Sequence, residues 1–366
     1  EAAVVSSFAG VFNGNGHMIG NLAICNSRGN GPIGLFEEID AVGEVNDLGL
    51  EDMLVVGSCY TSSVLKFGGV CGENFGKINE CYVTGSITAN NLVGGLCGMN
   101  SGVLDDCQFT GDVTVSMYGG GVCGNNAGTI GGSDFVGLVT GNSSSGGICG
   151  DNNGGIDGCY GEGKIKCNRY AGMICGYNFD IISNSYGIGD IAGNPYNSAN
   201  IGGLCGRNEG GVINKCYSKC EITSKGWAGG FCGTMSNGEI NNCYSTGELK
   251  GELGLGGFCG SVTSGSVTNC YSTNFIDTDS TDRIGGFCGS SYDSVITNSF
   301  WDVDVSGIGA SGDDNYGAVG KSTEQMLIGS LYVDAGWDLV EGWWINEGRD
   351  YPRLSWQPFG DLDNDS

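Results

Sequence analysis

The apolar residues of this chain occur in short runs that are separated by polar, glycine-rich turns. The segment Val83-Thr84-Gly85-Ser86-Ile87-Thr88 is representative, and Gly, Asn, Ser and Asp stand between such runs. No window keeps the 3.6-residue period of an amphipathic helix over several turns. The pattern therefore predicts short strands joined by tight turns, without long helices.

A short signature, Gly-Gly-x-Cys-Gly, recurs along most of the chain, strictly or with one substitution. Its cysteines follow one another at a nearly constant interval, as their numbers show: Cys71, Cys97, Cys123, Cys149, Cys175, Cys205, Cys232, Cys259 and Cys288. A second signature, such as Ile78-Asn79-Glu80-Cys81-Tyr82, follows each of the first ones after a polar turn. This repeat is too short for a propeller blade and carries no leucine ladder.

We predict an all-β fold, a β-solenoid (a β-helix or stack of β-arches) of 26–30-residue coils with atypical capping ends. Residues 68–299 are expected to form nine coils. Residues 1–67 are expected to form degenerate coils and a cap, because Phe36 stands where the next coils have cysteine. Residues 300–366 hold five of the six tryptophans and an acidic tail. We expect this aromatic cluster to cover the last coil, with stacking on carbohydrate as the alternative use.

The cysteines allow several arrangements. Where both signatures have cysteine, 10 or 11 positions separate the two, and a strand, a turn and a returning strand can bring both into the coil interior. This predicts the intracoil disulfides Cys71–Cys81, Cys97–Cys107, Cys149–Cys159, Cys205–Cys216, Cys232–Cys243 and Cys259–Cys270. Neighbouring rungs, about 4.8 Å apart, also satisfy disulfide geometry, so pairing along a ladder competes.

Buried free thiols that act as small apolar groups are the third arrangement. Ser133, Ser185 and Ser299 replace the second cysteine in three coils, which leaves Cys123, Cys175 and Cys288 as repeat-ladder cysteines without an intracoil partner. A zinc site does not fit, because the chain has no CxxC pair and only one histidine, His17. The odd total of 19 cysteines leaves at least one for a bridge between chains.

Composition excludes several classes of protein. The chain has 72 glycines but only 4 prolines, and no collagen-type triplet repeat. Its 41 acidic and 15 basic residues give a net charge of −26, which argues against a nucleic-acid partner. No apolar run is long enough for a membrane span. The chain begins at Glu1 without a signal sequence, so we expect a secreted, extracellular protein whose signal peptide has been removed.

No residue pattern predicts catalysis, and we expect the protein not to be an enzyme. The lysines and arginines are scattered, although the many acids leave a polysaccharide lyase or hydrolase as a minor alternative. No cofactor is expected, except calcium at two acidic loops. These are Asp302 and Asp304 with Asp313 and Asp314, and Asp361, Asp363 and Asp365 in the tail. Asn142 begins an Asn-Ser-Ser acceptor pattern for N-glycosylation.

The repeat unit Gly-Gly-Leu-Cys-Gly-x-Asn-x-Gly resembles the GLUG motif of secreted bacterial and archaeal surface proteins, with cysteine at a position that is usually aliphatic. The acidic, cysteine-rich array is also similar to the sheath proteins of filamentous methanogenic archaea. The resemblance implies an extracellular repeat module without a fixed activity. We therefore expect a homopolymer that assembles through sheet edges and disulfides into an amyloid-like sheath or fibre, with other cell-envelope components as further partners. A surface adhesin or carbohydrate-binding module is the alternative.

Overall fold

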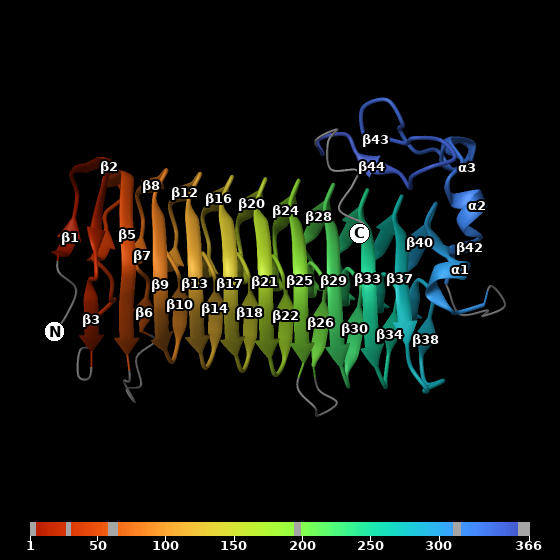
Figure 1. The fold of residues 1–366 in the computed structure, drawn as a ribbon, viewed down its shortest axis with the longest axis horizontal. Coiled ribbons are helices and arrows are strands. Elements are labelled where there is room, and N and C mark those ends of the chain that lie inside the picture. The colour runs from red at the N-terminus through yellow and green to blue at the C-terminus, as the bar shows by residue number, and fades with distance from the viewer. Residues whose placement is uncertain (1–4, 27–30, 58–64, 194–198, 310–315, 358–366) are drawn as a thin grey trace.

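The computed structural model describes residues 5–26, 31–57, 65–193, 199–309 and 316–357. Its strands stack in a single row along one axis, and the strands of successive coils pair in parallel (Figure 1). The expected all-β solenoid is confirmed. Three parallel sheets run the length of the row, and an isolated antiparallel pair lies in the C-terminal segment.

The first sheet, sheet A, carries the first cysteine signature. Cys71, Cys97 and Cys123 are direct register partners on adjacent strands, and the column continues to Cys288. Two earlier strands extend this sheet, with Val5 and Phe36 in the same column. Its strands are β1 (Val5–Phe8), β4 (Phe36–Ile39), β7 (Cys71–Asn74), β11 (Cys97–Asn100), β15 (Cys123–Asn126), β19 (Cys149–Asn152), β23 (Cys175–Asn178), β27 (Cys205–Glu209), β31 (Cys232–Ser236), β35 (Cys259–Thr263) and β39 (Cys288–Tyr292).

Sheet C precedes sheet A within each coil and consists of very short strands. They are β6 (Lys66–Phe67), β10 (Leu92–Gly94), β14 (Tyr118–Gly120), β18 (Ser144–Gly146), β22 (Tyr170–Gly172), β26 (Asn200–Gly202), β30 (Trp227–Gly229), β34 (Leu255–Gly256) and β38 (Ile284–Gly285). The turn from sheet C to sheet A requires glycine. A Cβ on Gly94 would lie 2.1 Å from the backbone oxygen of Cys97.

Sheet B follows sheet A and contains two ladders in each coil. The short ladder consists of β8 (Lys77–Asn79), β12 (Val103–Asp105), β16 (Thr129–Gly131), β20 (Gly155–Asp157), β24 (Ile181–Ser183), β28 (Val212–Asn214), β32 (Glu239–Asn241), β36 (Ser266–Thr268) and β40 (Val295–Thr297). The long ladder consists of β9 (Tyr82–Ala89), β13 (Gln108–Val115), β17 (Asp134–Gly141), β21 (Tyr160–Cys167), β25 (Tyr186–Gly193), β29 (Tyr217–Ser224), β33 (Tyr244–Gly251), β37 (Tyr271–Asp277), β41 (Phe300–Asp302) and β42 (Val319–Lys321). At the N-terminal end, β2 (Val11–Gly20) and β3 (Ala23–Asn26) pair with β5 (Glu44–Gly57).

The interior of the solenoid is a continuous core of stacked columns. Ile78, Leu104 and Ile130 lie one above the other and are almost fully buried, as are the cysteines of sheet A. Because each strand alternates inward and outward side chains, one repeated apolar position yields one buried column. Trp301 fills the end of this core beside Gly286, where a Cβ would meet its ring at 2.1 Å.

The C-terminal segment folds back along the side of the solenoid (Figure 1). It contains α1 (Val303–Ser306), α2 (Thr323–Met326), α3 (Gly329–Asp334) and the antiparallel pair β43 (Trp343–Trp344) and β44 (Arg353–Leu354). The sequence predicted an aromatic cluster over the last coil. Trp337 and Trp343 instead pack against Tyr244 and Tyr271 on the outer face of sheet B, so the cluster covers the lateral face of several coils.

Candidate functional site

The cysteines form two buried ladders of thiols. All cysteines of the two signatures are free thiols in the structure, and Cys71 Sγ lies 3.6 Å from Cys97 Sγ on the next coil. The six predicted intracoil disulfides, Cys71–Cys81 among them, are therefore not formed. Cys71 therefore contacts the corresponding cysteine of the next coil, as expected for a ladder of stacked cysteines.

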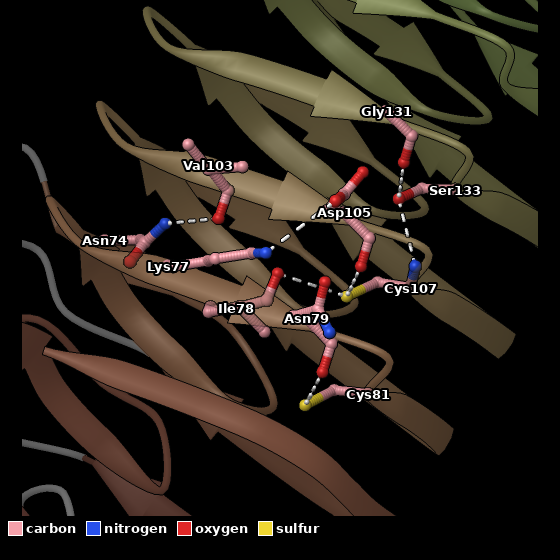
Figure 2. Close-up of polar contacts among 10 residues, drawn as sticks. All are labelled: Asn74, Lys77, Ile78, Asn79, Cys81, Val103, Asp105, Cys107, Gly131 and Ser133. Atoms are coloured by element: carbon pink, nitrogen blue, oxygen red, sulfur yellow. Dashed lines mark hydrogen bonds and ion pairs between the residues drawn. The ribbon is translucent and has the colours of Figure 1, made fainter. Parts of the chain in front are cut away.

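Most ladder thiols donate to a backbone carbonyl of their own coil. Cys97 Sγ lies 2.9 Å from the oxygen of Met99, and Cys107 Sγ lies 3.2 Å from the oxygen of Asp105. Ser133 Oγ takes the same role on the coil after Cys107, at 2.8 Å from the oxygen of Gly131 (Figure 2). Cysteine and serine interchange in the second ladder because both supply a small side chain with one donor.

Burial disfavours the reactive thiolate form of several ladder cysteines. It raises the pKa of the Cys159 and Cys288 thiols to about 12, and it raises the pKa of Cys97 well above the ordinary value, with neighbouring thiols adding to the effect. The thiolate is the reactive form of cysteine, so a raised pKa suppresses oxidation and metal binding alike. No group of three or more His, Cys, Asp or Glu side chains within the described ranges is arranged to hold a metal ion.

A third buried column consists of asparagines and was missed by the sequence analysis. Asn74 Nδ2 donates to Asn100 Oδ1 at 2.8 Å, and the same bond repeats up to Asn208. Each amide also bonds the backbone of its own turn, as Asn74 does with Gly76. The signal was present in the sequence, because each of these asparagines ends the pattern Cys-Gly-x-Asn that begins at a first-signature cysteine.

In the first acidic loop, the Asp302 carboxylate accepts hydrogen bonds that hold neighbouring segments together. Asp302 is fully buried, and its Oδ1 accepts from the N–H groups of Asp304 and Val305. Its Oδ2 accepts from Thr323 and Tyr351. Four donors therefore occupy the carboxylate that was considered for calcium. Asp313, Asp314, Asp361, Asp363 and Asp365 lie outside the described residues.

Asn142 and Asp151 differ in their exposure to solvent. Asn142 is exposed in the turn between β17 and β18, where its Oδ1 accepts from Asn168 Nδ2 at 2.7 Å. Its glycosylation stays a prediction. Asp151, in contrast, is buried, and burial raises its pKa to about 6. Its Oδ1 has no hydrogen-bond partner among the described residues.

Most of the strands at the two ends of the solenoid have no charged side chains. At the N-terminal end, β1, β2 and β3 contain no Asp, Glu, Lys or Arg. At the C-terminal end, the edge strand β42 carries Lys321 and its neighbour β41 carries Asp302, whereas β38, β39 and β40 contain no charged residue. Large apolar side chains are exposed there as well, including Val11 and Met18 at one end and Tyr292 and Val295 at the other. Charges and prolines are the usual protection of an exposed edge, and the six uncharged strands lack both.

A comparison with known protein families finds a match that covers one coil of the repeat. The family model of the GLUG motif matches residues 251–277, which span one coil from the end of β33 through β37. No curated protein and no solved structure matches the chain. None of the helices in the described part has the length and hydrophobicity needed to cross a membrane. The chain is therefore a β-solenoid with a GLUG motif at residues 251–277, and eight further coils carry the same cysteine signature.

Proposed function

We propose that this protein is a non-enzymatic, extracellular structural protein that assembles end to end into a sheath or fibre of the cell envelope. The proposal rests on the uncharged strands β1, β2 and β3 at one end of the solenoid and β38, β39 and β40 at the other. All coils have the same chain direction, so the last coil of one copy can pair in parallel with the first coil of the next. Such a head-to-tail contact uses two different surfaces and does not close on itself.

The lateral surface of the solenoid supports this choice of contact. Salt bridges link adjacent coils there, such as Lys164 with Asp190 at 2.7 Å and Lys225 with Glu252 at 2.8 Å. Charged side chains therefore lie along the sides, where they keep the particle soluble, and are absent from these six end strands. Main-chain pairing at the ends supplies the attraction, and the exposed Val11 and Val295 add apolar area.

Because the ladder thiols are buried, disulfides between copies have only a small role in the proposed assembly. The ladder sulfurs lie inside the coils and cannot reach a second chain without unfolding. Edge pairing is therefore the main contact between copies, and we expect reductant alone to leave the polymer intact. Trp337 and Trp343 are buried against the solenoid and are not exposed for the stacking on carbohydrate that an adhesin would use.

Lysine substitutions on the last coil and on a middle coil test the proposal. Ile181 and Val295 occupy the same outward column, Ile181 on a middle coil and Val295 on the last one. They are 48% and 58% exposed, so neither substitution disturbs the core. Val295→Lys combined with Tyr292→Lys is expected to abolish fibres or sheets in electron micrographs of the purified chain. Ile181→Lys is the matched control and is expected to assemble normally.

Either of two results would contradict end-to-end assembly. The first is that the unmodified chain stays monomeric at high concentration in sedimentation experiments. The second is that Ile181→Lys prevents assembly while the end variant still assembles, which would place the contact on the lateral face.

A further inference from the structure

A groove of about 620 Å³ lies between the outer face of sheet B and the C-terminal segment. Its floor is the tyrosine column of the long ladder, from Tyr160 through Tyr186, Tyr217 and Tyr244 to Tyr271, with the next outward side chain of each strand beside it. Its wall is the segment 349–357, which contributes Arg349, Asp350, Tyr351, Arg353 and Gln357. None of these residues takes part in the end contacts.

The tyrosine floor is rigid and presents ring edges to the groove. Neighbouring rings stack at centroid distances of 4.4 to 5.0 Å. Their faces therefore lie along the solenoid axis, while their edges and hydroxyls point outward. The wall is fixed to this floor, since Tyr271 Oη donates to the oxygen of Pro352 at 2.7 Å and Gln357 Nε2 donates to Tyr244 Oη at 2.8 Å.

The shape of the groove fits a linear polymer. Tyr217, Tyr244 and Tyr271 are buried beneath the C-terminal segment, so the open floor is the adjacent row of outward side chains. Its accessible members lie on four successive rungs, which span roughly 14 Å at about 4.8 Å per rung, enough for a few sugar units in a row: Glu162, Ile188, Lys219 and Thr246. The strands beneath are already paired on both sides, so the groove offers no free edge for an extended peptide. Apolar side chains that could bind peptide side chains are scarce, with Ile188 as the aliphatic member of the lining.

The chemistry of the lining fits a saccharide that carries carboxylates. The partly exposed Thr246 hydroxyl can donate to and accept from sugar hydroxyls, and the Tyr160 hydroxyl can accept from them. Three cations, Lys219, Arg349 and Arg353, outnumber the two carboxylates, Glu162 and Asp350. This excess of positive charge is local, because the chain as a whole has 41 acidic and 15 basic residues. Tyr160 donates to Glu162, which holds that carboxylate at the side of the groove.

We propose that this groove binds a linear polysaccharide bearing carboxylates, with Arg349 and Lys219 as the residues that recognise its acidic groups. Both side chains are exposed at the groove, and guanidinium and ammonium groups form strong, charge-assisted hydrogen bonds with carboxylates. The site lies on the lateral face, so it remains accessible when copies join through their ends. It would attach the polymer to acidic glycans of the cell surface.

Calorimetric titration of the full chain with a tetramer of galacturonic acid tests the proposal. We expect binding that weakens as salt is added, and a loss of about tenfold in affinity with Arg349→Gln and with Lys219→Gln. Lys164→Gln is the matched control, because Lys164 is an exposed lysine of β21 outside the groove lining. It removes the same charge as Lys219→Gln and should leave binding unchanged.

Four outcomes would overturn this assignment: no binding of the tetramer, equal binding of a neutral glucose tetramer, equal binding of a single-stranded oligonucleotide, or an equal loss with Lys164→Gln. The end variants Tyr292→Lys and Val295→Lys lie outside the groove lining, so they should still bind the tetramer. The groove and the end-to-end assembly are therefore tested independently.

Discussion

Asn126 Nδ2 donates to Asn152 Oδ1 at 2.8 Å, from one coil of the solenoid to the next and in full burial. The same Nδ2 reaches the backbone oxygen of Gly155 on that next coil at 3.2 Å. Asn126 Oδ1 in turn accepts from Asn100 Nδ2 at 2.8 Å. One amide thus links three coils, and its bonds run along the axis of the protein.

Replacing Asn126 by alanine is expected to destabilise the protein by about 2 to 4 kcal/mol, because it removes the buried bonds of Asn126 with Asn100, Asn152 and Gly155. Lost hydrogen bonds between buried polar groups are costly. Urea unfolding followed by circular dichroism measures the change. Asn125→Ala, one residue earlier and only partly buried, is the control and should shift the stability by less than about 0.5 kcal/mol. Equal stability of the two variants would contradict the role of the asparagine column.

Gly94→Ala should prevent native folding or destabilise it by more than about 3 kcal/mol. The added Cβ would lie 2.1 Å from the backbone oxygen of Cys97 and 2.7 Å from Cα of Cys123, and neither backbone atom can move without shifting a coil. Gly20→Ala is the matched control, since no atom lies within 4 Å of its Cβ position. Circular dichroism and size-exclusion chromatography compare the two. A normally folded Gly94→Ala variant would contradict this close approach of adjacent backbones.

The ladder thiols are expected to resist alkylation in the folded protein. Burial holds the pKa of Cys159 and Cys288 at about 12, so little thiolate is present in mildly alkaline buffer. Iodoacetamide labelling followed by peptide mapping should modify the exposed Cys25 rapidly and the ladder cysteines only after denaturation. Recovery of peptides joined by a Cys71–Cys81 bridge from the native protein would instead restore the intracoil disulfides predicted from the spacing.

Asp151 should make the protein less stable as the pH rises through about 6. Burial raises its pKa from 3.8 to about 6, so the folded state binds this proton more tightly than the unfolded chain. The corresponding stability is complete below about pH 4 and lost above about pH 6, and it amounts to about 2 to 3 kcal/mol. Asp151→Asn should remove this part of the pH dependence in urea unfolding and be more stable than the unmodified chain in mildly alkaline buffer. Asp112→Asn, at an exposed position, is the control and should keep the wild-type profile.

The coils could be predicted from the sequence because one inward-facing position is occupied by cysteine in every coil from Cys71 to Cys288. Cys71 to Cys288 mark a position that returns to the same face once per coil, and the fold repeats with them. The partners of these cysteines could not be predicted from spacing alone. The short separation of Cys71 and Cys81 in the sequence brings both into one coil, whereas the register between strands decides that Cys71 contacts Cys97.

The position of the C-terminal segment and of the groove beneath it could not be predicted, because it is set by contacts between residues far apart in the sequence. Trp356 Nε1 donates to the oxygen of Lys215 at 3.1 Å, across 141 positions of sequence. The tyrosines on which this segment packs did have a signal, because they follow the second-signature cysteines directly, as in Cys243-Tyr244. That signal places them in one column, but it does not show which segment covers the column.

The parallel register of sheet A sets the dimensions that a polymer of this protein would have. Eleven strands at about 4.8 Å each amount to roughly 53 Å along the axis. Fibre diffraction from aligned material should therefore give a sharp meridional reflection at about 4.8 Å and a long axial repeat of about 53 Å. The folded-back C-terminal segment would mark that repeat once per molecule, always on the side nearer the same end. The filament would consequently be directional, with two ends that grow at different rates.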